Sequence, residues 1–230
     1  MLILAVDTST PSGSLAVLED QRLLGLVATS TDETYSSRMF RHLEFLLREL
    51  SLEMKRFDLY AVVAGPGSFT GLRVGLTAAK GWAEVHDKPI AAVSALEAVA
   101  EQASRQPEWI AAVTDARRGQ IYGGLYRRIA DGLHKQGDEV VMTAAEFLAE
   151  VASRTGGATP VFATPSQAVL ADALAASRFR GAQVEEVSAV LAPVVGRIGW
   201  HRAQNGNVVD ALTLDAHYIR RSDAELLWKG

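Results

Sequence analysis

The sequence predicts an α/β protein with two related subdomains, each a mixed sheet flanked by helices. Each half opens on a short apolar run that ends in an aspartate, Asp7 in the first half and Asp115 in the second. A turn, a second strand and a hairpin follow in both halves, and the hydrophobic period then changes from that of a strand to that of a helix. We therefore expect the subdomains to span residues 1–105 and 106–230, with three meandering strands at the start of each sheet.

Composition limits the function classes. The chain has 230 residues, of which 48% are hydrophobic and 22% charged, as in ordinary globular proteins. The absence of cysteine excludes a disulfide framework, a thiolate zinc site and a cysteine nucleophile. A net charge of −4 disfavours strong autonomous binding to nucleic acid. The first apolar run is too short for a signal peptide, and no run approaches the length of a membrane span, so we expect a cytoplasmic chain without membrane contact.

In the first half, apolar runs predict strands at residues 1–6, 14–18, 22–29, 59–64 and 90–93. Amphipathic spacing predicts a helix at about 36–50, with Ser36 or Ser37 as its N-cap. Two further helices are expected at about 68–85, after a glycine turn, and at about 94–104.

In the second half, strands are expected at residues 110–114, 121–126 and about 139–142, with a hairpin turn at Asp131-Gly132. Helices are expected at about 144–154, 166–177 and 188–205. Gly206 stands where a glycine commonly ends a helix.

The tetrapeptide after the first strand, from Asp7 to Thr10, has two interpretations. Its hydroxyls and turn amides suit a phosphate, and its carboxylate suits a hydrated magnesium ion, with Asp115 facing it across a cleft between the subdomains. Alternatively, Asp7 caps its own loop in an Asx turn, which the tetrapeptide alone favours. No histidine has a partner at metal-ligand spacing and no nucleophile has a marked base, so we expect neither a metal site nor a catalytic residue.

The most distinctive stretch is GPGSFTGLR, residues 65–73, which joins a strand to a helix. It matches neither a P-loop nor a dinucleotide loop, so the motif does not support phosphate binding. Gly71 and Gly75 share a helical face that another helix can approach closely, and Arg73 and Lys80 share a face beside apolar residues. The stretch therefore indicates a protein–protein interface, or else an ordinary core helix, with Ser68 as its N-cap.

Near the end of the chain, residues 218–221 (YIRR) are either a recognition tail or a terminal docking arm.

Four motifs together resemble one family. They are ILAVDTST (residues 3–10), GPGSFTGLRVG (65–75), VSAL (93–96) and DAR (115–117) with Tyr122. In this order and spacing the chain resembles the TsaB (YeaZ) family of bacterial proteins, which take part in making threonylcarbamoyladenosine in tRNA. The resemblance implies the actin/Hsp70/sugar-kinase (ASKHA) architecture, in agreement with the duplicated halves.

The resemblance also implies a role. Members of the family are non-catalytic partners of TsaD, the catalytic subunit, and form homodimers through a similar surface when alone. TsaE, a small ATPase, joins the pair, so ATP is used by the wider complex, no cofactor is expected on this chain alone, and tRNA is reached only through the complex. The expected partner interface is formed by Met39, Leu43, Leu46, Leu47, Ser68, Phe69, Thr70, Gly71, Leu72, Arg73, Leu76 and Lys80. A vestigial phosphate clamp would comprise Asp7, Ser9, Thr10 and Asp115.

Two alternatives stay open. One is an ATP-dependent enzyme of the same superfamily, with the clamp residues around a magnesium nucleotide. The other is a peptidase, for which the sequence offers neither a nucleophile nor a metal site.

Overall fold

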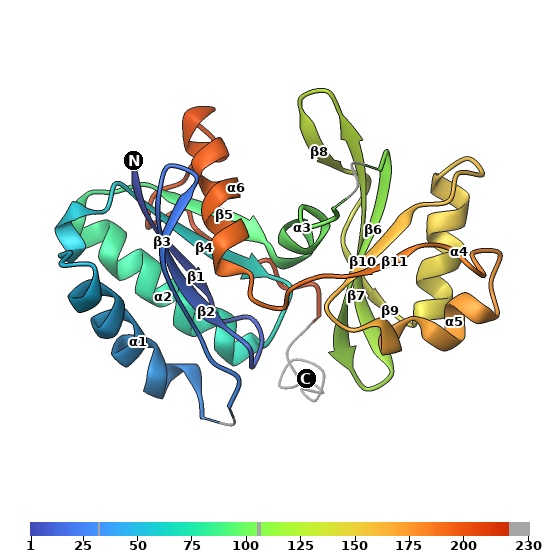
Figure 1. Cartoon of the computed structure of the whole chain (residues 1–230), viewed down its shortest axis with the longest axis horizontal. Helices are drawn as coiled ribbons and strands as arrows, with labels where there is room; N and C mark the ends of the chain where they lie inside the picture. Colours follow the sequence, from blue (N-terminus) through green and yellow to red (C-terminus); the bar gives the residue numbers. More distant parts are fainter. Residues whose placement is uncertain (32, 105–106, 221–230) are drawn as a thin grey trace, which may run out of the picture. The chain divides into compact units, whose positions relative to one another are not determined.

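The chain divides into two compact units. The computed structural model describes residues 1–31, 33–104 and 107–220. Unit 1 comprises Met1–Ala95 together with the chain from Val190 onward, and unit 2 comprises Leu96–Ala189 (Figure 1). The expected division into residues 1–105 and 106–230 is therefore corrected at both ends of unit 2. The last helix returns to unit 1 because its glycine face packs directly on strands of the first sheet.

Unit 1 is built on a five-stranded sheet with the order β3-β2-β1-β4-β5. Its strands are β1 (Leu2–Asp7), β2 (Ser14–Glu19), β3 (Arg22–Ala28), β4 (Leu59–Gly65) and β5 (Ile90–Ser94). Its helices are α1 (Tyr35–Glu49), α2 (Phe69–His86) and α6 (Ala192–Gln204), with a 3-10 turn η1 (Met54–Arg56). The first three strands form the predicted antiparallel meander, and β4 and β5 add in parallel.

The N-cap of α1 differs from the prediction. The helix begins after Thr34, whose side chain makes no capping bond. Ser36 and Ser37 therefore lie inside the first turn of the helix.

Helices cover both faces of the sheet in unit 1. Tyr60 of β4 packs against Trp82 of α2, with ring centroids 5.8 Å apart. The next residue, Ala61, faces Gly199 of α6 so closely that a Cβ at position 199 would lie 2.7 Å from the Cβ of Ala61. Because successive side chains of a strand point to opposite faces, α2 and α6 lie on opposite sides of the sheet.

Unit 2 repeats this topology. Its sheet has the order β11-β10-β6-β7-β8, and β9 pairs with β7. The strands are β6 (Trp109–Arg117), β7 (Gln120–Ile129), β8 (Gly132–Lys135), β9 (Val140–Met142), β10 (Val161–Thr164) and β11 (Val184–Glu186). The helices are α3 (Ala95–Ala100), α4 (Ala144–Arg154), the 3-10 turn η2 (Gln167–Val169) and α5 (Ala171–Ala175). In both units the first strand of an antiparallel meander pairs in parallel with a fourth strand, so the predicted relation between the two halves is confirmed.

Several predicted helices are shorter than expected. The helix predicted at 94–104 ends at Ala100, that at 188–205 begins at Ala192, and that at 166–177 is a 3-10 turn followed by five residues of α5. Strands β8, β10 and β11 were not predicted. The third strand of the second meander, expected at about 139–142, is instead β8, whereas Val140–Met142 forms β9, which pairs separately with β7. Strands β10 and β11 complete the sheet by pairing in parallel with β6 and with each other, and β10 buries all four of its residues.

No helix within the described part of the chain is long and apolar enough to cross a membrane.

Candidate functional site

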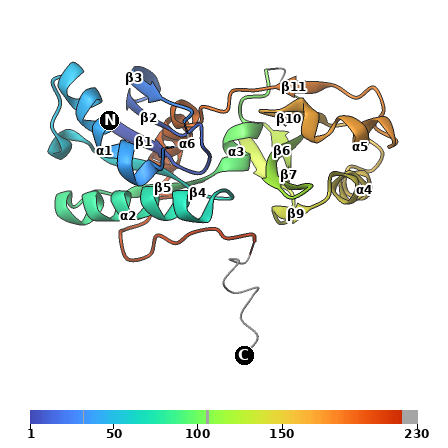
Figure 2. The same ribbon diagram turned by 90° about the horizontal axis from the view of Figure 1, so that it is seen from below.

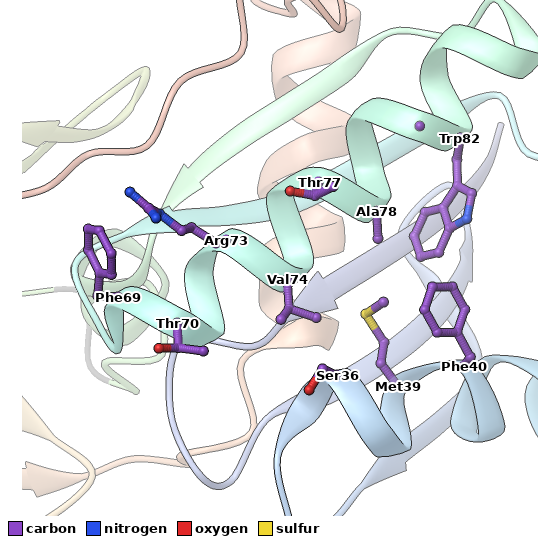
Figure 3. Close-up of a pocket in the computed structure, with 11 residues that line it drawn as sticks. Ser36, Met39, Phe40, Phe69, Thr70, Arg73, Val74, Thr77, Ala78 and Trp82 are labelled. Atoms are coloured by element: carbon purple, nitrogen blue, oxygen red, sulfur yellow. The ribbon is translucent and has the colours of Figure 1, made fainter.

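A surface groove of about 640 Å³ runs between α1 and α2 in unit 1. It combines aromatic, aliphatic and hydroxyl side chains with one guanidinium group, as Figure 3 shows. The lining residues are Ser36, Met39 and Phe40 of α1 and Phe69, Thr70, Arg73, Val74, Thr77, Ala78, Gly81 and Trp82 of α2.

The most exposed large apolar side chain in the groove is that of Phe40. It is 57% exposed and points toward α2, close to Met39 and Trp82 (Figure 3). An apolar hollow with exposed aromatic area, bordered by polar side chains, is typical of a surface that binds another protein.

Five residues of the expected interface belong to the core of unit 1. Their side chains are at most 6% exposed, and the residues are Met39, Leu43, Leu46, Leu72 and Leu76. Met39 lines the groove from below, and the other four support the two helices without offering area to a partner. The expected set is corrected in this respect, because an apolar stripe of an amphipathic helix is buried first by its own sheet.

The remaining expected residues lie nearer the surface. Phe69, Thr70 and Arg73 line the groove, whereas Ser68, Gly71, Leu47 and Lys80 are exposed or half-buried outside its lining. Ser68 acts as the predicted N-cap of α2, since its Oγ accepts a hydrogen bond from the amide of Gly71 at 3.3 Å.

Sequence reasoning missed most of the groove. The missed residues are Ser36, Phe40, Val74, Thr77, Ala78, Gly81 and Trp82. A signal was present, because Thr70, Val74, Thr77 and Gly81 follow helical spacing on the side of α2 away from its leucines. That second face is only weakly apolar, and the leucine face of α2, which is buried in the core, gives the stronger sequence pattern.

Gly71 and Gly75 have a different role from the one expected. A Cβ at position 71 would lie 2.0 Å from the carbonyl oxygen of Thr8, and one at position 75 would lie 2.4 Å from the Thr8 hydroxyl. That hydroxyl donates a hydrogen bond to the carbonyl of Gly71 at 2.7 Å. The two glycines therefore let α2 lie against the loop that follows β1, and they do not serve the approach of another helix.

That loop is an Asx turn, as the tetrapeptide favoured. The Oδ1 atom of Asp7 accepts hydrogen bonds from the amide of Ser9 at 2.8 Å and from its hydroxyl at 2.6 Å. Asp7 is fully buried, and this burial raises the pKa of its carboxyl to about 6. Ser9 is thus bonded to Asp7, whereas the Oδ2 atom of Asp7 and the hydroxyl of Thr10 are buried without a hydrogen-bond partner among the described residues.

The equivalent position in unit 2 forms the same turn. The Oδ1 atom of Asp115 accepts a hydrogen bond from the amide of Arg117 at 2.7 Å. The carboxyl of Asp115 is partly exposed, with its Oδ2 atom 3.6 Å from the guanidinium of Arg117. Because Asp7, Ser9 and Thr10 lie in unit 1 and Asp115 in unit 2, the clamp across them stays a prediction. Within the described residues, no three His, Asp or Glu side chains gather as a metal site would require.

The end of the described chain is a docking arm. The amide of His217 donates a hydrogen bond to the carbonyl of Ala64 at 2.7 Å, and the ring of Tyr218 packs on Phe69. Of the two interpretations of residues 218–221, the structure supports the second; Arg221 lies outside the described residues.

Comparison with known proteins identifies the family. A family model described as "TsaD: tRNA N6-adenosine threonylcarbamoyltransferase" matches residues 16–190. The tRNA threonylcarbamoyladenosine biosynthesis protein TsaB of Bacillus subtilis is 37% identical over 146 residues, which are 63% of this chain and 63% of that protein. The structure of YeaZ from Pseudomonas aeruginosa has a TM-score of 0.78 at 25% identity, covering 94% of this chain and 99% of that one.

The chain belongs to the TsaB (YeaZ) family. The alignment spans less than two thirds of the length of the Bacillus subtilis TsaB.

A ROK family protein from Streptococcus pneumoniae, solved in complex with sucrose, has a TM-score of 0.51 at 11% identity, covering 90% of this chain and 100% of that one. This likeness concerns the fold alone. Together with the YeaZ structure and the repeated topology, it gives this TsaB-family chain the predicted ASKHA architecture.

Proposed function

We propose that this chain is a non-catalytic subunit in the biosynthesis of threonylcarbamoyladenosine in tRNA, and that it acts by binding a TsaD-type catalytic subunit. The observation that carries the proposal is the apolar groove between α1 and α2 on a chain of the TsaB family. The TsaD-type subunit transfers the threonylcarbamoyl group to N6 of an adenosine beside the anticodon. The TsaE-type ATPase and the tRNA join through the complex.

The chemistry of the groove supports a protein partner. Met39, Phe40 and Trp82 provide apolar area at one part of the groove, and Arg73 provides a positive charge beside Phe69 (Figure 3). Tryptophan and arginine are the side chains that most often dominate binding energy at protein interfaces. A helix with apolar residues facing the groove and a carboxylate near Arg73 would complement it.

Two of the side chains that suggested chemistry make structural hydrogen bonds. Asp7 is bonded to Ser9 within its own turn, and Ser68 caps α2. These contacts support a binding role over catalysis by this chain. When the catalytic subunit is absent, we expect the same groove to pair two copies of the chain.

The test uses two exposed phenylalanines on the same helix. Phe40 is 57% exposed and lines the groove, whereas Phe45 is 47% exposed and lies outside the lining. Phe40→Asp places a charge in the apolar groove, so we expect it to weaken binding to purified TsaD by about 30-fold, or roughly 2 kcal/mol. Phe45→Asp is the matched control and should change the affinity by less than about threefold. Calorimetric titration gives the two dissociation constants, and light scattering gives the mass of each complex.

A wild-type chain that does not bind TsaD would contradict the proposal, as would a Phe40→Asp variant that binds like wild type. If the wild-type chain forms only a homodimer and Phe40→Asp makes it monomeric, the groove is an interface between copies of this chain and the catalytic subunit is not its partner.

A further inference from the structure

The arm formed by residues 216–218 runs beside α2, as Figure 2 shows. The amide of His217 donates to the carbonyl of Ala64 at 2.7 Å, which fixes the arm at the end of β4. The fit is close because a Cβ at position 65 would lie 2.2 Å from the carbonyl oxygen of His217. The backbone of the arm is thus held against the turn from which α2 starts.

Tyr218 connects this arm to the groove. Its ring lies 4.8 Å from that of Phe69, measured between centroids, and its hydroxyl accepts a hydrogen bond from Nε of Arg73 at 3.2 Å. The guanidinium of Arg73 in turn lies 3.8 Å from the centroid of the Phe69 ring. Phe69 and Arg73 both line the groove, but Tyr218 does not.

We propose that Tyr218 is a positioning residue for partner binding, which holds Phe69 and Arg73 in the orientation that the partner meets. This inference rests on the proposed function of the groove. An exposed arginine that is free to change rotamer loses side-chain entropy when a partner binds it. Stacking on Phe69 and the hydrogen bond to Tyr218 restrict Arg73 beforehand, so the arm lowers the entropy lost at this end of the groove.

The opposite effect is a distinct outcome. If the arm competed with the partner for Phe69 and Arg73, removing the Tyr218 ring would strengthen binding. The sign of the change in affinity therefore separates a supporting arm from a blocking one.

The experiment measures the dissociation constant for purified TsaD with full-length variants. We expect Tyr218→Ala to weaken binding about tenfold, because both the ring contact and the hydrogen bond are lost. Tyr218→Phe keeps the ring contact with Phe69 but loses the hydrogen bond from Arg73, so it should weaken binding by about threefold, between wild type and Tyr218→Ala. Leu212→Ala is the control, since Leu212 is 86% exposed on the same segment and outside the groove.

A double-mutant cycle tests whether Tyr218 acts through Arg73. When Arg73 is already alanine, Tyr218→Ala should change the logarithm of the dissociation constant by at most about half as much as it does in the wild-type chain. Melting temperatures of all variants are recorded, and a loss of affinity counts only where the melting temperature is retained. If Tyr218→Ala is destabilised, the cycle is built with Tyr218→Phe, whose effect should disappear in the Arg73→Ala background because the hydrogen bond it removes is already absent there.

The inference is overturned if wild type binds TsaD and Tyr218→Ala binds equally well or more tightly. It is also overturned if the effects of Tyr218→Ala and Arg73→Ala simply add. A wild-type chain that fails to bind TsaD overturns the proposed function itself, and with it this inference, so the two failures are distinguishable.

Discussion

Replacing Gly71 by alanine is expected to lower the free energy of unfolding by about 3 kcal/mol, at the upper end of what overpacking usually costs. The added Cβ would lie 2.0 Å from the carbonyl oxygen of Thr8, which is a backbone atom. Thr8 cannot move aside cheaply, because its hydroxyl is bonded to the carbonyl of Gly71 at 2.7 Å and it follows the fully buried Asp7. Either α2 or the loop after β1 must shift.

Gly81→Ala is the matched control on the same helix. A Cβ at position 81 meets nothing within 4 Å, so the change should raise the free energy of unfolding by about 0.5–1 kcal/mol through helix propensity. Urea denaturation followed by tryptophan fluorescence measures both variants, and Trp82 and Trp200 report on unit 1. Equal stability of the two variants would show that the approach of Thr8 to α2 does not constrain the fold.

The free energy of unfolding is expected to fall as the pH rises from about 4 to 7, through the titration of Asp7. Burial raises the pKa of this carboxyl from 3.8 to about 6 in the folded chain. Between about pH 4 and 6 the folded state binds the Asp7 proton more tightly than the unfolded state does. The protonated carboxyl therefore stabilises the fold fully below about pH 4, and this stabilisation is lost as the pH passes about 6. A rise of about 2 in the pKa corresponds to about 3 kcal/mol.

Asp7→Asn should remove this dependence. The amide oxygen can still accept the hydrogen bonds from Ser9, but the side chain no longer ionises. The stability of the variant relative to wild type should therefore increase by about 3 kcal/mol between pH 4 and 7, whatever constant offset the substitution adds. Urea denaturation at a series of pH values gives the free energy of unfolding of both proteins. If the two free energies changed in parallel with pH, the buried Asp7 carboxylate would not be the source of the pH dependence.

The local sequence predicted the two helices that border the candidate site, although not most of the residues that line it. The glycine turn and Ser68 placed the start of α2, and the spacing of leucines placed both helices that border the groove. The sequence did not show which side of each helix stays exposed. Met39 and Phe40 are neighbours in sequence, yet Met39 is 1% exposed and Phe40 is 57% exposed. That difference depends on the sheet beneath α1 and on α2 beside it.

Local sequence also failed to predict a short strand. The prediction missed β10, a run of four residues, because so short an apolar segment has no period that separates a strand from a buried helix turn. Its identity comes from pairing with β6, some fifty residues earlier in the chain.

By itself, the sequence determined the α/β class, the meander that opens the first half and the Asx turn at Asp7, since these depend on hydrophobic period and turn chemistry within a few residues. Only the tertiary structure decided that α6 returns to unit 1, that Gly71 and Gly75 face Thr8, and that Phe40 and Trp82 border a groove. Each of these depends on contacts between segments far apart in the chain, and local periodicity carries no information about which distant surface will bury a given side chain.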